Sequence, residues 1–311
     1  MDKLECFERF PVAMSEPSIT LEEEATVIDT LITLYPNAKK NSLRRMIDHG
    51  RVMADGVRMN RANTMISSGI TIKVLSKADG DQKKGNNKNS LEEPEVLFSD
   101  NEIIVVNKPE GLLTVATDRG ESDTMYDRVS NWASKNLKKR IFLVHRLDRE
   151  TSGCMIFTTS QESKDMLQSQ FKNRTIERIY HAVVFGKPQT KSGMESIRIQ
   201  ETKDKRVRLV IGNKRAGKEA ITHWKIEKTG PVNSLLRIKI DTGRRAQIRL
   251  HMANINCPVL GDTRYGRGKT SVNRLCLHAS ELIFQHPNGE EIHVISSIPK
   301  KLISELNRKS L

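Results

Sequence analysis

The chain is poor in the residues that build covalent or metal-bound scaffolds. Its 311 residues include four cysteines, far apart and without a Cys-x-x-Cys pair, which disfavours a disulfide framework or a zinc ribbon. The eight histidines form no His-Glu-x-x-His motif, so we expect no metal site. No apolar stretch approaches the roughly 18 residues of a membrane-spanning helix, so we expect no membrane partner.

The beginning of the chain also lacks a basic segment followed by an apolar run, the pattern of a secretion signal. Acidic side chains occur there instead, at Asp2, Glu5, Glu8 and Glu16. Together with the sparse cysteines, this composition favours a cytoplasmic protein.

Positive charge is abundant but unevenly distributed. The net charge is +14, made up of −6 over residues 1–30, +8 over 31–90 and +12 over 91–311. Such a surplus indicates a polyanionic partner, but charge alone does not separate RNA from DNA or from an acidic surface.

A polar segment, residues 77–95, divides the chain. It offers little to bury and therefore predicts a linker. We expect a flexible lead-in over residues 1–20, a small module over 21–76 and a larger domain over 96–311, which agrees with the two domains that the length suggests.

The small module has a clear order of predicted elements. Apolar residues at helical spacing predict a first helix that ends before Pro36. Ser42 is the expected N-cap of a second short helix that ends at Gly50. Asp55-Gly56 then predicts a tight hairpin turn, and residues 70–74 a further strand.

Basic residues cluster around the second helix of this module. Lys39, Lys40, Arg44, Arg45 and Arg51 form a cluster for which an ordinary solvated face is as good an explanation as a binding surface. The order of helix, basic helix and hairpin resembles the S4 RNA-binding domain over residues 21–75. That resemblance implies RNA contacts by Lys40, Arg44 and Arg45. Two positions depart from the usual pattern, Lys-Lys-Asn-Ser at residues 39–42 and Asp55 before the glycine.

In the larger domain, one charged loop lies between two predicted strands. Residues 142–144 and 154–159 are apolar and strand-like, and the loop between them contains Asp148 flanked by Arg146 and Arg149. Positive neighbours favour the ionised form of a carboxylate, which makes Asp148 a candidate nucleophile or base. The alternative is that Asp148 only holds an arginine or caps the turn.

The loop His-Arg-Leu-Asp-Arg-Glu-Thr-Ser-Gly, residues 145–153, is similar to the signature of the RluA-like family of pseudouridine synthases, the ribosomal large subunit type. Further motifs of that family follow the same order across residues 97–300: Asn107–Leu113, Ile179–Val183, Gly217–Thr222, Thr242–His251, Gly261–Gly266 and Arg274–Ala279. The resemblance implies an α+β fold whose catalytic domain has a mostly antiparallel sheet. Ala246 stands where the family usually has histidine, and we expect altered packing or substrate fit there with catalysis retained.

The family's reaction converts uridine in RNA to pseudouridine without any cofactor. The resemblance assigns Asp148 as the catalytic carboxylate and Arg249 as the residue that pairs with it and keeps it ionised. Tyr180 would stack on the target base and help to remove the C5 proton. From the strand alternation alone, an ordinary sheet residue is the better explanation of Tyr180.

Other residues would contact the substrate. The resemblance places His145 and Arg146 at the RNA, with Arg146 filling the space of the flipped-out base or, alternatively, forming a second salt bridge. Ile248 or Leu250 would line the base pocket, although core packing is the better explanation for both. We expect large-subunit rRNA as the first choice of substrate, tRNA as the second, and a monomeric enzyme. A non-catalytic RNA-binding assembly factor and a base-releasing hydrolase remain alternatives.

One phosphate-loop pattern is set aside. Residues 212–218 have the spacing of such a loop, but Glu219 replaces the Ser or Thr that would hold magnesium. We therefore expect no nucleotide cofactor.

Overall fold

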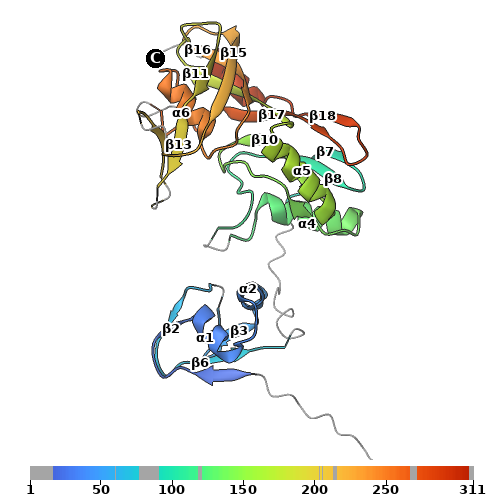
Figure 1. Ribbon diagram of the computed structural model, residues 1–311, viewed down its shortest axis with the longest axis vertical. Coiled ribbons are helices and arrows are strands. Elements are labelled where there is room, and N and C mark those ends of the chain that lie inside the picture. Colours follow the sequence, from blue (N-terminus) through green and yellow to red (C-terminus); the bar gives the residue numbers. More distant parts are fainter. Residues whose placement is uncertain are drawn as a thin grey trace, which may run out of the picture. The chain divides into compact units, whose positions relative to one another are not determined.

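The computed structural model describes residues 17–59, 61–76, 91–117, 121–202, 204, 206–212, 216–266 and 272–307 (Figure 1). Backbone contacts divide the chain into two compact units: one holds residues up to Ser90 with Thr117–Glu121, the other Leu91–Ala116 and Ser122–Leu311. Most of the expected lead-in and of the expected linker, residues 1–16 and 77–90, lies outside the described residues. Residues 18–20 of the expected lead-in form a strand that pairs with residues 71–73.

In its described residues, the small unit combines two helices with short strands. Its elements are β1 (Ser18–Thr20), β2 (Ala25–Thr26), α1 (Val27–Leu34), α2 (Lys40–Asp48), β3 (Val52–Ala54), β4 (Val57–Arg58), β5 (Met65–Ile66) and β6 (Thr71–Val74). Four strands form a sheet in the order β1-β6-β3-β4, and β2 pairs with β5. Apolar side chains of both helices, including Leu31, Leu43 and Ile47, pack on this sheet with Ile72.

In the small unit, the predicted hairpin turn is confirmed, but the predicted N-cap of the second helix is not. Asp55 and Gly56 both have positive φ, 44° and 81°, and join β3 to β4 as predicted. The expectation that Ser42 caps the second helix is wrong: α2 begins at Lys40, and its N-cap Lys39 makes no side-chain cap bond. Ser42 therefore lies inside the first turn, where its hydroxyl cannot cap.

The large unit is built on one extended sheet. Its strands are β7 (Glu95–Ser99), β8 (Ile103–Lys108), β9 (Phe142–Leu143), β10 (Ser152–Thr158), β11 (Glu177–Phe185), β12 (Ser192–Ser196), β13 (Arg198–Glu201), β14 (Val207–Val210), β15 (Ile221–Thr229), β16 (Asn233–Ile240), β17 (Leu277–Gln285) and β18 (Glu291–Ile295). Eight of them follow the order β12-β15-β16-β11-β17-β10-β8-β7, with β18 on β17 and β9 on β10, while β13 and β14 form a separate hairpin. All pairings are antiparallel except that of β10 with β17, which confirms the mostly antiparallel sheet.

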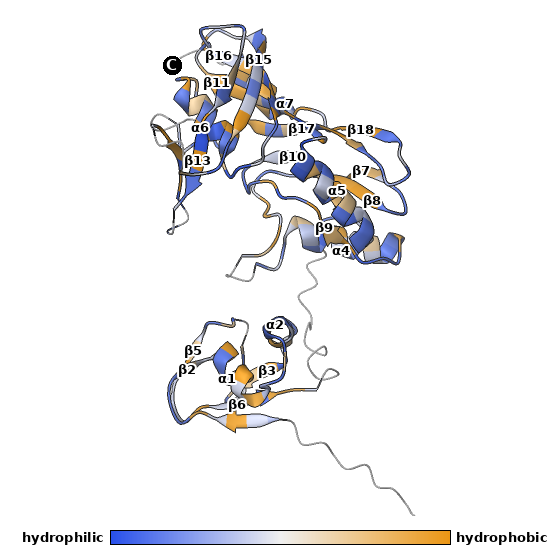
Figure 2. Ribbon diagram, viewed as in Figure 1, coloured by the Kyte–Doolittle hydropathy of each residue, from blue (hydrophilic) through white to orange (hydrophobic). Residues whose placement is uncertain are grey.

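Four helices accompany this sheet: α4 (Met125–Asn136), α5 (Gln161–Asn173), α6 (Gln247–Asn254) and α7 (Lys300–Leu306). Thr124 and Asp127 form a reciprocal capping box at the start of α4. Helix α5 packs near β10 and β17, and α7 against β11 and β16 (Figure 1). Strand β8 begins with four buried apolar residues, 103–106, and ends in Asn107 and Lys108. Its apolar part is orange in Figure 2.

One glycine brings the loop before β10 against β17. Gly153 has φ 117°, and a Cβ there would lie 2.1 Å from the carbonyl oxygen of Ala279. Only glycine permits this approach. The Asp148 loop is thereby anchored at the crossing of β10 and β17, where several of the family-like motifs meet.

Candidate active site

The Asp148 loop connects β9 to β10. Asp148 is half-buried, and its backbone carbonyl accepts a hydrogen bond from the Thr151 N–H at 3.1 Å. Within the described part of the chain its carboxylate accepts no hydrogen bond, so it neither caps the turn nor holds an arginine through one. Both carboxylate oxygens are therefore available to another molecule.

The loop is fixed by the segment that follows β8. The buried Thr114 hydroxyl donates to the Leu147 carbonyl at 2.9 Å and accepts from the Leu147 N–H at 3.3 Å. The Arg149 Nε donates to the Gly111 carbonyl at 2.9 Å, and the Gly111 N–H returns a bond to the Arg149 carbonyl. These bonds hold the residues on both sides of Asp148.

A buried lysine lies beneath this junction. Lys108 is fully buried, and its Nζ donates to the carbonyls of Pro109, Leu112 and Arg149 at 2.9, 2.7 and 3.1 Å. Burial lowers its pKa to about 8, although nearby carboxylates, Asp148 among them, oppose the shift. Lys108 lies in the family-like motif Asn107–Leu113, but no pattern in the sequence predicted a role for it.

Arg249 lies on α6 and forms a buried ion pair with Asp262. Its Nε and Nη2 each donate to one oxygen of the Asp262 carboxylate at 2.8 Å, and the two side chains are 10% and 1% exposed. Burial opposes the charge of Arg249, but the bonds to Asp262 and the charges of Asp148 and Glu150 raise its pKa. The third nitrogen, Nη1, is 3.7 Å from Glu150.

This pairing corrects the expected Arg249–Asp148 pair. Among the hydrogen bonds of the described residues, none joins these two side chains; Asp148 influences Arg249 through space only. The Asp262 carboxylate also accepts hydrogen bonds from the backbone N–H groups of Arg264 and Tyr265. These bonds hold the carboxylate where Arg249 can donate to both of its oxygens.

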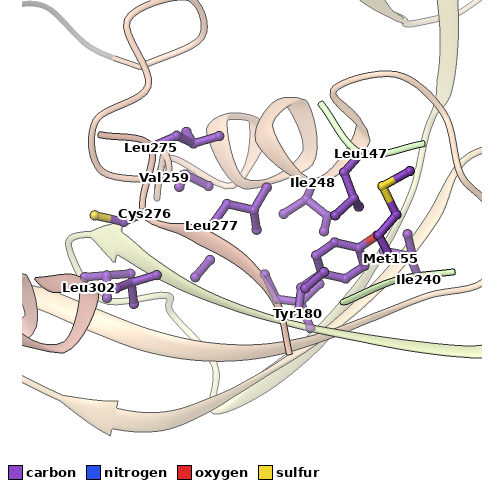
Figure 3. Close-up of a cluster of buried hydrophobic side chains, with 14 of the residues drawn as sticks. Leu147, Met155, Tyr180, Ile240, Ile248, Val259, Leu275, Cys276, Leu277 and Leu302 are labelled. Atoms are coloured by element: carbon purple, nitrogen blue, oxygen red, sulfur yellow. The ribbon is translucent and has the colours of Figure 1, made fainter. Parts of the chain in front are cut away.

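Tyr180 lies on β11 with its ring in the core, 8% exposed. Figure 3 shows it beside Leu147, Met155, Ile240 and Ile248. Burial raises the pKa of its phenol, with Arg178 lowering it and Asp148 raising it. Ile248 is thus placed next to Tyr180, while the role of either at the substrate remains a prediction.

Two residues that were predicted to contact the substrate, Leu250 and His145, pack against other parts of the protein. Leu250 packs with Ile199, Val207 and Ala220 in a separate cluster, because positions 248 and 250 point to different sides of α6. His145 packs on Phe171, with ring centroids 4.8 Å apart, and its Nε2 accepts the Ile156 N–H at 3.1 Å.

This environment determines the protonation state of His145. Burial, aided by the charge of Arg178, lowers its pKa to about 3, so the ring is neutral and carries its proton on Nδ1. The structure therefore assigns His145 a packing role in place of the expected RNA contact.

The basic residues predicted to bind RNA are exposed. Arg146 is exposed in the Asp148 loop, and Lys40, Arg44 and Arg45 are exposed on α2 of the small unit. Their exposure permits RNA contact, which stays a prediction.

A row of bonded polar side chains supports the end of the Asp148 loop at Ser152. Arg274 pairs with Glu110, and its Nη2 donates to the Ser152 hydroxyl at 3.0 Å. His278 uses Nε2 to donate to the Ser296 carbonyl, so its Nδ1 accepts from Ser152 at 2.9 Å. Arg274 and His278 both lie in the family-like motif Arg274–Ala279, but no pattern in the sequence predicted a role for either.

A cavity of about 630 Å³ opens beside Glu110 and Arg274. Its lining is formed by Glu110, Gly111, Glu150, Gly261, Thr263, Val272, Asn273, Arg274 and Leu275. Glu150 and Arg274 connect it to the residues around Asp148, so it gives a ligand space next to the candidate carboxylate.

Ala246 has an unusual backbone conformation. It is the N-cap of α6, with φ 54° and no side-chain cap bond, and it is 6% exposed. An alanine in the left-handed region is strained. The residue that departs from the family pattern is therefore also a strained one.

Over the described ranges, no group of three histidine, cysteine or carboxylate side chains is placed to hold a metal ion. In the same residues, no helix is long and apolar enough to cross a membrane.

Comparison with known proteins identifies the family. A model of the RNA pseudouridylate synthase family matches residues 102–254. The chain is 31% identical over 269 residues to an uncharacterised RNA pseudouridine synthase of Mycoplasma genitalium, covering 84% of each. The chain belongs to the RNA pseudouridine synthase family. Asp148, Tyr180 and Arg249 all come from motifs shared with its RluA-like branch.

Two further comparisons agree with this RNA-modifying enzyme. The synthase is 26% identical to ribosomal large subunit pseudouridine synthase D of Yersinia pestis, over 89% of this chain and 88% of that protein. The structure of human RNA pseudouridylate synthase domain containing 4 matches with a TM-score of 0.58 at 24% identity, covering 68% of this chain and 91% of that one. The latter likeness shows the shared fold.

Proposed function

We propose that this synthase isomerises specific uridines of large-subunit rRNA and that Asp148 is its catalytic carboxylate. The observation that carries the proposal is the Asp148 carboxylate, which accepts no hydrogen bond within the described chain and lies in a loop held by Thr114 and Gly111. A nucleophile or base needs free lone pairs, whereas the nearby buried groups Lys108, Arg249 and Asp262 already have partners.

The reaction conserves all atoms. The N1–C1′ bond of uridine breaks, the uracil turns, C5 bonds to C1′, and the proton leaves C5 while N1 gains one. Asp148 either adds to the nucleoside or takes a proton from the ribose; its geometry serves both. Neither route consumes a cofactor, and no nucleotide is part of the proposal.

The target base must leave its stack to reach this half-buried carboxylate, which costs a few kcal/mol. Arg146, exposed in the same loop, is suited to stack in the vacated place because a guanidinium plane packs on bases. Tyr180 supplies a ring next to Asp148 on which the flipped uracil can stack.

The choice of rRNA rests on the names of relatives. Several of them are ribosomal large subunit pseudouridine synthases D, and they align along most of this chain. We propose that the small unit is an S4-like domain that docks RNA through Lys40, Arg44 and Arg45. We further propose a monomer that works in the cytoplasm; tRNA is the alternative to rRNA as the substrate.

The test is tritium release from RNA labelled at uridine C5, comparing the wild type with D148N. The amide is isosteric but carries no charge, so D148N should release no tritium while binding RNA as before. Unchanged release by D148N would refute the assignment of Asp148. D165N, an exposed helix carboxylate on α5, is the matched control.

Mapping pseudouridine in cells lacking the protein identifies the substrate. Loss of a site in large-subunit rRNA supports the proposal, and loss only in tRNA overturns the choice of rRNA. If neither changes and RNA is still bound, the protein is an assembly factor; free uracil in the assay would instead indicate a hydrolase.

A further inference from the structure

Gln247, the first residue of α6, has a buried amide that no step of the proposed chemistry uses. The residue is 3% exposed, and its carboxamide makes four hydrogen bonds. A carboxamide has two N–H donors and an oxygen with two lone pairs, so every bonding position is occupied. An apolar side chain would fill this space without the cost of burying an amide, so the amide needs an explanation.

The oxygen of the carboxamide holds the loop that precedes α6. It accepts from the Thr242 hydroxyl at 2.8 Å and from the Arg244 N–H at 3.0 Å. Ala246, the N-cap with φ 54°, lies between this loop and the helix and makes no side-chain cap bond. The side chain of Gln247 therefore closes the turn that contains the strained residue.

The nitrogen of the carboxamide connects α6 to β15. Nε2 of Gln247 donates to the Ile221 carbonyl at 2.9 Å and to the Thr222 hydroxyl at 3.0 Å. The same hydroxyl is 2.9 Å from Nδ1 of His251, whose Nε2 donates to the Ile197 carbonyl at 3.2 Å. Burial lowers the pKa of His251, so its ring is neutral and Nδ1 accepts from Thr222.

These bonds lie on the side of α6 that is opposite to Arg249. Gln247 and His251 are four residues apart and share a helix face, whereas Arg249 is two residues from each, about 200° around the axis. On its own face, Arg249 binds Asp262 and places Nη1 3.7 Å from Glu150, two residues after Asp148. The rotation of α6 that is fixed at β15 therefore determines where the guanidinium lies.

We infer that Gln247 is a positioning residue of the active site: with Thr222 and His251 it fixes the rotation of α6, so that Arg249 holds its charge beside the Asp148 loop. A satisfied buried network of this kind selects one arrangement of the elements that it joins. Its effect on turnover rests on the proposed function, whereas its effect on the place of Arg249 does not.

The first test follows Arg249 without RNA. In nitrogen-15-labelled protein, the buried Nε–H of Arg249 should exchange slowly with water because it is bonded to Asp262, and R249K assigns its signal. Q247M has a similar length but no amide, so this exchange should become about tenfold faster or more. T222V removes the hydroxyl and should act in the same direction. T222S keeps the hydroxyl and should exchange near the wild-type rate.

The matched control is N233L. Asn233 on β16 is 5% exposed, and its Nδ2 donates to the Glu305 carbonyl at 2.8 Å, so this buried amide holds α7 to the sheet as Gln247 holds α6. N233L should lower the free energy of unfolding and leave the exchange at Arg249 unchanged. If Q247M does not fold, the pair T222V and T222S carries the comparison.

The second test is tritium release. Q247M should lower kcat by about tenfold or more with little change in KM, while T222S and N233L should keep the wild-type kcat. Wild-type exchange at Arg249 in folded Q247M or T222V overturns the inference, and so does equally fast exchange in N233L. Faster exchange with an unchanged kcat also overturns it, because the network would then be structural alone. Faster exchange in a protein whose wild type releases no tritium refutes the proposed function and leaves the hold on Arg249 standing.

Discussion

Arg249 donates to both oxygens of the Asp262 carboxylate at 2.8 Å each, so the arginine expected to pair with Asp148 binds a different carboxylate. Arg249 therefore acts on Asp148 only as a fixed nearby charge. Asp262 sets where that charge lies.

Removing Asp262 should misplace Arg249. D262A leaves a buried, unpaired guanidinium and orphans the N–H groups of Arg264 and Tyr265, so the free energy of unfolding should fall by about 3 kcal/mol or more. Tritium release should fall with it. E177Q breaks the exposed Glu177–Lys239 pair and should cost less than about 1 kcal/mol in urea unfolding. Equal losses in both variants would contradict this account.

Lys108 should make the protein more stable as the pH rises through the alkaline range. Its pKa is about 8 in the folded protein and 10.5 in the unfolded chain, so the unfolded state binds more protons between these values. The contribution of Lys108 to the free energy of unfolding therefore rises as the pH increases from 8 to 10.5. K108M should remove that rise in urea unfolding across the window, and K239M, at an exposed lysine, should keep it.

The same substitution should lower activity. Without the Lys108 ammonium, the carbonyls of Pro109, Leu112 and Arg149 lose a shared donor and the support beneath Asp148 loosens. We expect K108M to reduce kcat in tritium release at pH 7. Full activity of K108M would show that the backbone bonds of Thr114 and Gly111 suffice.

His145 should make the protein sensitive to acid. Its pKa is about 3 when folded and 6.5 when unfolded, so its contribution is complete above pH 6.5 and is lost as the pH falls toward 3. H145Q retains an acceptor for the Ile156 N–H but does not titrate, so its stability should fall less steeply over this window. Circular dichroism during acid titration measures this, with H223Q on the sheet surface as control.

The sequence predicted those features that depend on local chemistry. Asp55-Gly56 has the two positive φ angles that its turn needs, and Pro36 follows the end of α1 closely. Apolar runs predicted β9 and β10, and the family resemblance implied the mostly antiparallel sheet. The partners of buried charges were not predictable in this way, since Arg249 could reach either Asp148 or Asp262 and only the packed geometry selects one.

Lys108 was missed for a related reason. A charged residue at a strand end is usually solvated, and no pattern in the sequence shows that tertiary packing encloses it. The only available signal was that it stands within a family motif.

The strain at Ala246 was also invisible in the sequence. A246G removes the Cβ from a left-handed position, so stability should rise by about 1 kcal/mol. The thermal midpoint measures this, and A253G, inside α6, should lower it instead. A lower midpoint for A246G would show that packing of the buried methyl group outweighs the strain.

Charge reversal on α2 tests the small unit. Lys40, Arg44 and Arg45 are exposed there, and each phosphate contact adds nearly one to the slope of log Kd against log salt. The triple variant K40E/R44E/R45E should bind structured RNA at least tenfold more weakly, with a shallower slope in a filter-binding salt series. K191E/K225E/K228E makes the same change of charge at exposed lysines of the large unit and serves as control. If both triple variants lose affinity and slope equally, the basic surplus acts through total charge, and α2 is an ordinary solvated face.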